Sequence, residues 1–341
     1  MEFLTVSDES ILRAASVLAD GGLVAFPTET VYGLGADAFN PAALAKVFAA
    51  KGRPRFDPLI IHIAAVQTLE KIADLSLLCG AAREKLDALA ETFWPGPLTV
   101  ILPKQKTVPE LATSGLATVA VRFPVHPAAQ RLIALAGGAV AAPSANPFGY
   151  LSPTRASHVR DQLGAAVDII LDGGPCAVGV ESTVLDLCGE RPCVLRPGGV
   201  PWEKIEALIG TVDVGVHDHA AGQENHTGMV SPGMLKSHYA PRTPLAVFSR
   251  EEIIALPDSE GKAAFLFFDG AARAAWLAGK PECYAKLLTL SERGDLLEAA
   301  AKLFEYLHEL DNSCVTCINA QLAPGQGLGM AINDRLRRAA C

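Results

Sequence analysis

The chain has 341 residues, of which half are hydrophobic and only 6% aromatic, and it carries a formal net charge of -8. This composition is typical of compact α/β proteins and excludes a disordered or repetitive chain, which buries too little apolar surface to fold. The acidic charge also disfavours a protein whose main task is unspecific nucleic-acid binding, because that task needs a basic surface.

Helix and strand patterns alternate through the first 210 residues. Apolar residues at helical spacing predict a helix over residues 9–20, and an apolar strand follows at 23–26. The same reasoning predicts helices at 41–50, 81–93 and 128–136, and strands at 59–64, 98–102, 118–123, 139–142, 169–171, 182–187 and 194–196. We therefore expect an α/β domain over residues 1–210, built on a twisted open mixed sheet with helices.

Residues 211–243 show little regular pattern and are rich in Gly, His, Ser and Pro. A segment of this length without an element is unusual inside a compact domain, so it indicates either a flexible linker or a functional lid. After it, strands at 245–248, 264–268 and 315–319 and a long helix at 294–310 predict a smaller Rossmann-like α/β domain over residues 244–341.

The chain start and the cysteines bear on location and metal binding. The first ten residues, MEFLTVSDES, lack the layout of a signal peptide, and the longest apolar run is too short to span a bilayer, so we expect a cytoplasmic protein with no membrane partner. Cys314 and Cys317 form the single CxxC pair in the sequence. Without a second pair or a histidine cluster nearby, they predict no metal site.

The segment 27–35, PTETVYGLG, places two threonines and two glycines on a predicted turn directly after a strand. Threonine hydroxyls offer donors and acceptors, and glycines let the main chain approach a ligand closely. An ordinary connection between two elements explains the same residues equally well.

Two pairs of polar side chains are candidates for ligand binding. Lys51 and Arg53 lie in a loop stiffened by prolines and suit phosphate recognition, although an ordinary basic surface loop is the alternative. His62 and Arg122 interrupt apolar strands, where each needs a partner, and the fork of an arginine fits a carboxylate. A satisfied core histidine and a structural ion pair compete with these functional interpretations.

Small polar residues recur where predicted strands begin or end, as in APSANPFG with Ser144 and Asn146, in ESTVLD with Ser182, and in VLRPGG with Arg196. Ligands gather at such strand ends in open α/β sheets. No GxxxxGK[ST], GxSxG or HExxH motif occurs. Hydroxyls, backbone groups and four cations thus predict a site for a polyanion and a small carboxylate, for which ATP and an amino acid would fit.

Seven motifs follow one another in the order found in the YrdC-like family: PTETVYGLG, KGRP with PLIIHI, FWPGPLT, VAVRFP, APSANPFG, ESTVLD and VLRPG. The later segments SPGMLKSHYAP and GLGMAINDRLRRAA resemble those of its longer, two-domain members, the threonylcarbamoyl-AMP synthases. The resemblance covers nearly the whole chain. It implies a nucleotidyltransferase that joins L-threonine, bicarbonate or CO2 and ATP into threonylcarbamoyl-AMP and releases pyrophosphate, with Mg²⁺ on the phosphates.

The same resemblance implies partners and residue roles. The product would feed downstream transferase machinery that modifies the adenosine beside the anticodon of tRNA, and a weak RNA contact by the chain itself stays open. Lys51 and Arg53 would be catalytic, with no protein metal ligands assigned. Threonine would be held by Thr30, His62, Arg122, Ala142 and Ser182, and ATP by Lys51, Arg53, Asp57, Thr118, Ser144, Asn146, Ser152, Arg196, His238 and Tyr239.

One departure from the family concerns the proposed lid. Relatives often read KYRHYAP where this chain reads LKSHYAP, so an arginine next to His238 is missing, and Lys236 would replace it only as a point charge. Two other functions compete with the synthase: an RNA-binding module that uses the same surface, and carbamoyl transfer in metal-centre maturation. The second usually comes with additional domains and zinc-finger cysteines that this sequence lacks.

Overall fold

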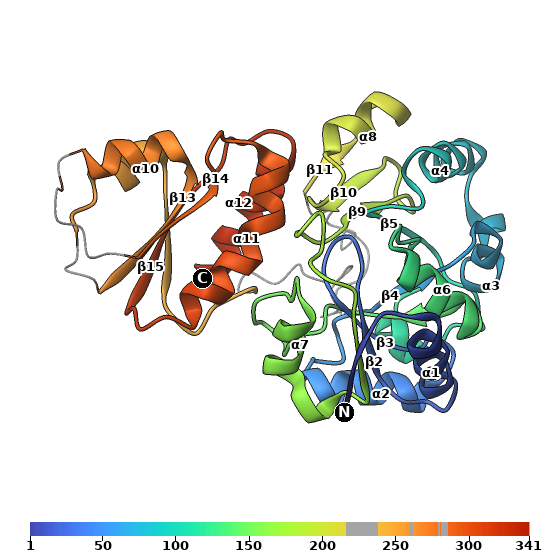
Figure 1. The fold of residues 1–341 in the computed structure, drawn as a ribbon. Helices are drawn as coiled ribbons and strands as arrows, with labels where there is room; N and C mark the ends of the chain where they lie inside the picture. The colour runs from blue at the N-terminus through green and yellow to red at the C-terminus, as the bar shows by residue number, and fades with distance from the viewer. Residues whose placement is uncertain (216–237, 259–261, 279, 281–285, 341) are drawn as a thin grey trace.

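Two β-sheets organise the chain in the computed structural model, which describes residues 1–215, 238–258, 262–278, 280 and 286–340 (Figure 1). An eleven-stranded mixed sheet lies within residues 2–214 of this described part, and a four-stranded parallel sheet lies within residues 245–321. The predicted fold class, a large mixed sheet followed by a smaller α/β unit, is confirmed. The boundaries at 210 and 243 stay a prediction.

The large sheet combines parallel and antiparallel neighbours. β4 and β6 are parallel, for example, whereas β5 and β6 are antiparallel. In spatial order its strands are β1 (Glu2–Thr5), β8 (Ile169–Asp172), β2 (Val24–Phe26), β3 (Gly33–Asp37), β7 (Ala139–Ala141), β4 (Ile60–Ile63), β6 (Thr118–Arg122), β5 (Leu98–Pro103), β9 (Thr183–Asp186), β10 (Cys193–Arg196) and β11 (Asp213–Val214).

Helices cover this sheet and begin at clear sequence signals. Pro41 opens α2 because its fixed φ suits the first turn, and the Asn40 side chain accepts hydrogen bonds from the next backbone amides. Gly52 ends α2 with a φ of 60°, which places Lys51 in its last turn. The α-helices are α1 (Asp8–Ala19), α2 (Pro41–Lys51), α3 (Leu69–Ile72), α4 (Gly80–Phe93), α5 (Glu110–Thr113), α6 (Pro127–Leu135), α7 (Ala156–Leu163) and α8 (Trp202–Ile209), with 3-10 turns at Val66–Thr68, Leu75–Leu77 and Gly164–Ala166.

The segment 27–35 connects two strands over residues 27–32, as its prediction as a turn requires, and differs from that prediction at residues 33–35. Its last three residues begin β3, which runs antiparallel to β2, so the segment is the inner part of a hairpin. A Cβ on Gly35 would lie 2.8 Å from a ring carbon of Phe26 and 2.9 Å from a methyl of Val140. Glycine is needed there for close packing within a strand, and sequence patterns misread that requirement as a turn.

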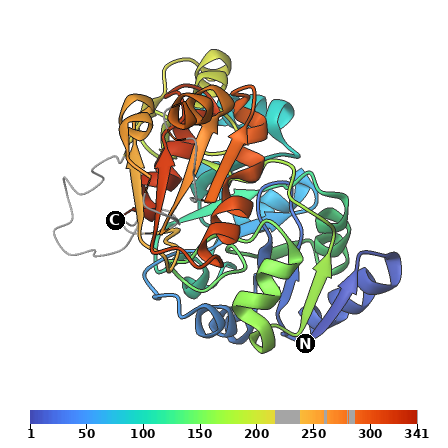
Figure 2. The same cartoon turned by 60° about the vertical axis from the view of Figure 1, so that its left-hand side comes forward.

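The small sheet has the order β12 (Leu245–Phe248), β15 (Cys317–Gln321), β13 (Ala263–Asp269) and β14 (Lys286–Ser291), and Figure 2 shows its strands running in one direction. Its helices are α9 (Arg250–Ala255), α10 (Gly270–Leu277), α11 (Leu296–Asp311) and α12 (Leu328–Ala339). The predicted strand at 315–319 is shifted by two residues. None of the helices in the described part of the chain has both the length and the apolar character that crossing a bilayer requires.

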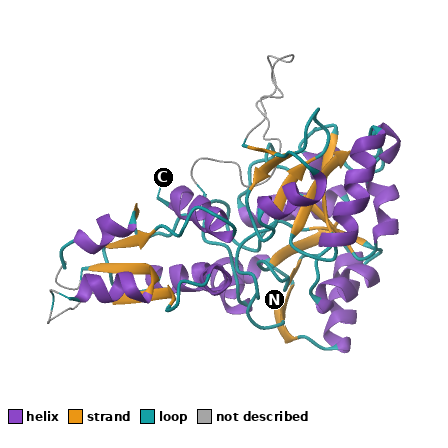
Figure 3. Cartoon of the chain, turned by 90° about the horizontal axis from the view of Figure 1, so that it is seen from above, coloured by secondary structure: helices purple, strands orange, loops and turns teal. Residues whose placement is uncertain are grey.

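The two sheets are joined through α11 and α12, which Figure 1 labels between them, and Figure 3 shows helices between the two groups of strands from above. Val31, Leu151 and Val180 from the first 210 residues belong to the same buried apolar cluster as the core of the C-terminal unit. Gly179 lies on α11 so closely that an added Cβ would be 2.4 Å from the carbonyl oxygen of Ala300. Backbone therefore meets backbone at this contact, with no room for a side chain.

Candidate functional site

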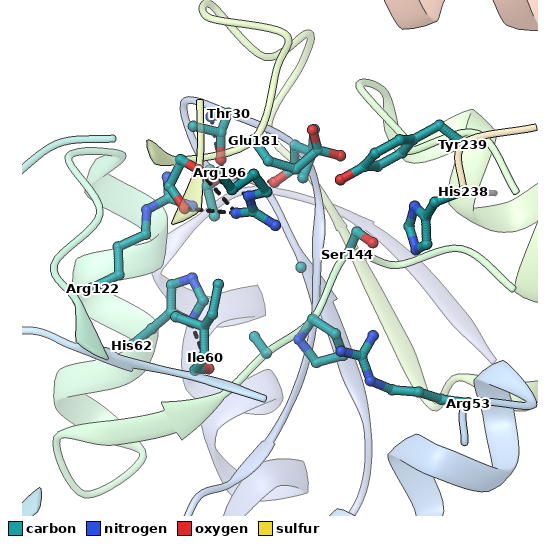
Figure 4. Close-up of a pocket in the computed structure, with 16 residues that line it drawn as sticks. Thr30, Arg53, Ile60, His62, Arg122, Ser144, Glu181, Arg196, His238 and Tyr239 are labelled. Atoms are coloured by element: carbon teal, nitrogen blue, oxygen red, sulfur yellow. Dashed lines mark hydrogen bonds between the residues drawn. The ribbon is translucent and has the colours of Figure 1, made fainter. Parts of the chain in front are cut away.

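A pocket lies where the ends of the central strands of the large sheet meet the segment at 238–239 (Figure 4). In this view His62 and Arg122 lie on one side of the pocket, and Arg53 and His238 lie on the other. The lining residues are Thr28, Thr30, Val31, Gly33, Arg53, Ile60, His62, Arg122, Ala142, Pro143, Ser144, Glu181, Ser182, Arg196, His238 and Tyr239.

Arg122 stands at the carboxyl end of β6 and pairs with a buried carboxylate. Its Nη2 donates to Oε1 of Glu29 at 2.7 Å, and the other Glu29 oxygen accepts from the amide of Val125 at 3.2 Å. Nε of Arg122 is buried and has no hydrogen-bond partner among the described residues. The ion pair with Glu29 compensates the buried charge of Arg122 within the sheet. It leaves part of the Arg122 guanidinium without a partner in the described part of the chain.

His62 is a neutral histidine with a defined orientation. Burial, reinforced by the positive charge of Arg122, lowers the pKa of His62 to about 3. Nδ1 lies 3.2 Å from the carbonyl oxygen of Ile60, an acceptor, so Nδ1 carries the proton and Nε2 is left as an acceptor. The ring is both a satisfied core residue and a wall of the pocket.

The two threonines of the motif form a directed chain of hydrogen bonds. The hydroxyl of Thr28 donates to the carbonyl of Val31 at 2.6 Å, which uses its one hydrogen. In the 2.9 Å contact between the two hydroxyls, Thr30 is therefore the donor. The lone pairs of Thr30 remain available to a ligand that donates.

Ser182 and Arg196 form a second polar group, at the start of β9 and the end of β10. The guanidinium of Arg196 donates to the carbonyl of Ser182 at 3.0 Å and to its hydroxyl at 3.2 Å. The Ser182 hydroxyl also lies 2.7 Å from that of Thr99. These contacts fix the start of β9 against the end of β10 and bring the arginine to the pocket.

Lys51 does not line the pocket but shapes its wall. Its ammonium donates to the carbonyls of Ser144 and Asn146 in the loop after β7. Burial, with the nearby charge of Arg53, lowers the pKa of Lys51 well below its ordinary value. The side-chain amide of Asn146 donates within the same loop, to Tyr150, and its oxygen has no partner in the described residues.

Arg53 reaches the pocket from the loop after α2 and is held by that loop. Nε donates to the carbonyl of Asp57 at 3.0 Å and Nη2 to that of Pro58 at 2.8 Å, while the Asp57 carboxylate lies 2.9 Å from Nη2. The ring of Phe148 lies 5.9 Å from the guanidinium carbon. These contacts set the direction of a buried cation before any ligand arrives.

Glu181 is a pocket residue that the sequence reasoning missed. One of its carboxylate oxygens accepts from the hydroxyl of Ser152 and the other from Nε of Arg335, at 2.7 Å, on helix α12. Burial opposes ionisation of Glu181, but the charges of Arg335 and Arg196 outweigh it and hold its pKa below the usual range. Its position directly before Ser182 was a local signal that could have identified it.

His238 and Tyr239 close the pocket on the side of Arg53. The His238 ring is buried against Phe148, with ring centroids 5.7 Å apart, and its Nδ1 has no hydrogen-bond partner among the described residues. Burial and the neighbouring cations lower the pKa of His238 well below 6.5. Tyr239 has a φ of 64°, in the left-handed region that non-glycine residues rarely adopt.

The remaining predicted site residues lie at different distances from the pocket. Ala142 lines it, Ser152 supports it through Glu181, and Asp57 supports it through Arg53. Thr118 lies at the opposite end of β6 from Arg122 and does not line this pocket. Lys236, and with it most of the proposed lid, falls outside the described residues.

The fold and the pocket define a class: α/β proteins that bind small ligands at the strand ends of a large mixed sheet, with buried cations directed into the site. Within it, the family model described as "Telomere recombination", which covers Sua5, YciO and YrdC, matches residues 16–198, and the model described as "Threonylcarbamoyl-AMP synthase, C-terminal domain" matches residues 200–341. The chain belongs to the threonylcarbamoyl-AMP synthase family, which is a family of enzymes.

Individual relatives agree over nearly the full length. The threonylcarbamoyl-AMP synthase of Pyrococcus abyssi is 41% identical, with 98% of this chain and 95% of that protein covered. That of Bacillus subtilis is 42% identical, with 99% and 94% covered. The crystal structure of P. abyssi Sua5 complexed with L-threonine superposes with a TM-score of 0.86 and 39% identity, covering 100% of this chain and 98% of the other.

Proposed function

We propose that the chain makes L-threonylcarbamoyladenylate and pyrophosphate from L-threonine, bicarbonate or CO2 and ATP. Similarity over the full length to threonylcarbamoyl-AMP synthases is the observation that carries this proposal. The product then serves the transferase machinery that modifies the adenosine beside the anticodon of tRNA.

The chemistry needs positioning and charge neutralisation more than a covalent nucleophile. The threonine amine attacks CO2, a nitrogen–carbon bond forms, and the amine loses a proton to give a carbamate. A carbamate oxygen then attacks the α-phosphorus of ATP, the bond to the bridging oxygen breaks, and pyrophosphate leaves. Held reactants and fixed cations supply the main catalytic effects in such a transfer.

The threonine end of the pocket is assigned to the side of His62 and Arg122. The unused part of the Arg122 fork is directed to the substrate carboxylate, and Nε2 of His62 and the hydroxyl oxygen of Thr30 accept from its ammonium or hydroxyl group. Ser182 and Ala142 complete this end. The assignment of these five residues to threonine is supported by their lining one pocket.

The ATP end is assigned to the side of Arg53 and His238. Arg53 and Arg196 neutralise phosphate charge, and Ser144 offers a hydroxyl from the loop that Lys51 holds. His238 and Tyr239 cover the nucleotide. Asp57, Ser152 and Asn146 act through the residues they orient, and Thr118 is assigned to the nucleotide by resemblance alone.

Mg²⁺ accompanies ATP in this proposal. In the described ranges no group of three His, Cys, Asp or Glu side chains is arranged to hold a metal ion. The nearby carboxylates of Glu29, Asp57 and Glu181 each pair with an arginine. These residues do not make a protein cage, so we assign the ion to the ATP phosphates, as part of the substrate.

Pyrophosphate release tests the proposal directly. Purified protein in CO2-depleted buffer receives ATP and Mg²⁺ with threonine and bicarbonate, with either one omitted, or with serine in place of threonine. We expect release only when the amino acid and bicarbonate are both present, and faster release with threonine than with serine. Release that continues unchanged without threonine would contradict the proposal.

A further inference from the structure

Helix α12 of the C-terminal unit carries a fully buried cation to the wall of the pocket. The side chain of Arg335 is 0% exposed, and its Nε donates to Glu181, whose side chain is 8% exposed. The two residues are 154 positions apart in the sequence. An arginine is rarely buried without a reason of charge or geometry.

Nη1 of Arg335 is also held, whereas its Nη2 is buried and has no hydrogen-bond partner among the described residues. Nη1 donates to the carbonyl of Pro197 at 2.9 Å and to Asp334 at 2.6 Å, and Asp334 is held in turn by Arg338. The guanidinium carbon lies 5.2 Å from the centroid of the Tyr239 ring. The planar group is therefore fixed between a pocket carboxylate and a pocket aromatic ring.

Glu181 connects Arg335 to the rest of the pocket through further hydrogen bonds. Its backbone carbonyl accepts from the amide of Gly199 at 2.9 Å, and the next residue, Ser182, is bound by Arg196. Its second carboxylate oxygen accepts from Ser152, whose carbonyl lies 3.1 Å from Nε2 of His308 on α11. Both interface helices of the C-terminal unit thus contribute to the placement of one pocket carboxylate.

Tyr239 depends on the same guanidinium. Its side chain is buried, its backbone is in the left-handed region, and its ring packs on Phe304 of α11 with centroids 5.6 Å apart. A tyrosine holds such a backbone conformation only where its surroundings fix it. The contacts of its ring with Arg335 and with Phe304 contribute to that constraint.

We propose that Arg335 is a positioning residue for the nucleotide end of the pocket, through Glu181 and Tyr239, so that the C-terminal unit completes a site built mainly by the first 210 residues. The identity of the nucleotide rests on the proposed function. The alternative is that Arg335 only stabilises the contact between the two units, and the two roles predict different results.

The first experiment compares Arg335→Met, Arg335→Lys and a matched control, Arg337→Met, which changes an exposed arginine of the same helix. Calorimetry measures the Kd of ATP and of threonine, and circular dichroism measures Tm. We expect Arg335→Met to raise the Kd of ATP by about tenfold to a hundredfold, as expected for a lost charge-assisted contact, and that of threonine by less than about threefold. Arg335→Lys should be intermediate because lysine keeps the charge and loses the fork.

A double-mutant cycle with Glu181→Gln then tests whether Arg335 affects ATP binding through Glu181. If Arg335 acts through Glu181, the double variant binds ATP no more weakly than Arg335→Met alone. Strictly additive losses would overturn the proposal. So would equal weakening of both ligands that follows the loss of Tm, because that is the behaviour of a purely structural contact.

A readout without ligand separates this inference from the proposed function. The amide of Ala240 donates to the carbonyl of Gly149 at 2.8 Å, next to Tyr239. Below the Tm of both variants, hydrogen exchange at Ala240 should be faster in Arg335→Met than in Arg337→Met. Equal exchange would overturn the positioning role. Absence of pyrophosphate release by the unaltered chain would instead refute the proposed function and leave this comparison valid.

Discussion

Arg122 and Glu29 form an ion pair with an N–O distance of 2.7 Å in which only 5% and 7% of the two side chains are exposed. The pair neutralises the arginine while Nε of the fork stays without a partner in the described structure. A carboxylate ligand would therefore meet a cation whose direction is already fixed, which lowers the cost of ordering on binding.

Arg122→Lys should weaken the use of threonine far more than that of ATP. Lysine offers a point charge in place of the planar fork, so the loss of one charge-assisted contact, about 1.5–3 kcal/mol, raises the KM of threonine by about tenfold to a hundredfold. Steady-state pyrophosphate release measures both KM values. Arg131→Lys, on the exposed face of α6, serves as the control. Equal increases in the two KM values would argue against the assignment.

His62→Gln should reduce the acid sensitivity of the fold. The folded pKa of about 3 lies below the ordinary value of 6.5, so between these values the unfolded chain binds the proton first. The stability associated with neutral His62 is complete above pH 6.5 and is lost as the pH falls. This histidine alone accounts for about 2 kcal/mol between pH 7 and 5.

Urea unfolding at pH 5, 7 and 8 checks this expectation. The drop in unfolding free energy from pH 7 to 5 should be about 2 kcal/mol smaller in His62→Gln, and the change from pH 7 to 8 should be alike in both proteins. An unaltered drop at pH 5 would show that His62 is not the group responsible.

Lys51→Met should damage the loop after β7. The substitution leaves the carbonyls of Ser144 and Asn146 without their donor, at a cost of about 1–3 kcal/mol for each. We expect a lower Tm and a higher KM for ATP, measured by calorimetry and kinetics. Lys46→Met on the same helix is the control, because Lys46 is exposed and donates to the carbonyl of Gly21, away from the loop after β7. Lost activity with an unchanged Tm would instead indicate direct contact with the phosphates.

Tyr239→Phe separates the hydroxyl from the ring. Phenylalanine keeps the contacts with Arg335 and Phe304, so Tm should change by no more than about 2 °C. If the hydroxyl contacts the nucleotide, the KM of ATP rises by about threefold to tenfold, as for one neutral hydrogen bond. Tyr239→Ala should lose stability as well, by about 3–5 kcal/mol. If the KM of ATP in Tyr239→Phe equals that of the unaltered chain, the ring of Tyr239 and not its hydroxyl contributes to ATP binding.

The sequence predicted the elements whose signals are local. Apolar runs located β4, β5, β6 and β12 within one residue, and Asn40 with Pro41 located the start of α2. Residues 33–35 were wrongly included in the predicted turn because the contact of Gly35 with Phe26 and Val140 is made only in the folded sheet. Local pattern carries no information about such close approach between strands.

Pocket residues could be predicted where a polar or charged side chain is unusual for the strand or loop that carries it. Arg53, His62, Arg122 and Arg196 were found because a charge or ring occurs in an apolar or proline-fixed setting. Glu181 was missed because its partner Arg335 is 154 residues away. An arginine on the apolar face of α12, one turn from Ala331 and Ala339, was the signal that could have pointed to a buried partner.

The contact of Gly179 with the backbone of α11 has a consequence for cooperativity. Because no side chain separates the two units there and they share one apolar cluster, the C-terminal unit cannot melt without exposing part of the first unit and leaving Glu181 unpaired. Heat or denaturant should therefore unfold both sheets in a single transition. The free energy that holds the small sheet in place is, by the same coupling, part of the free energy that keeps the pocket assembled.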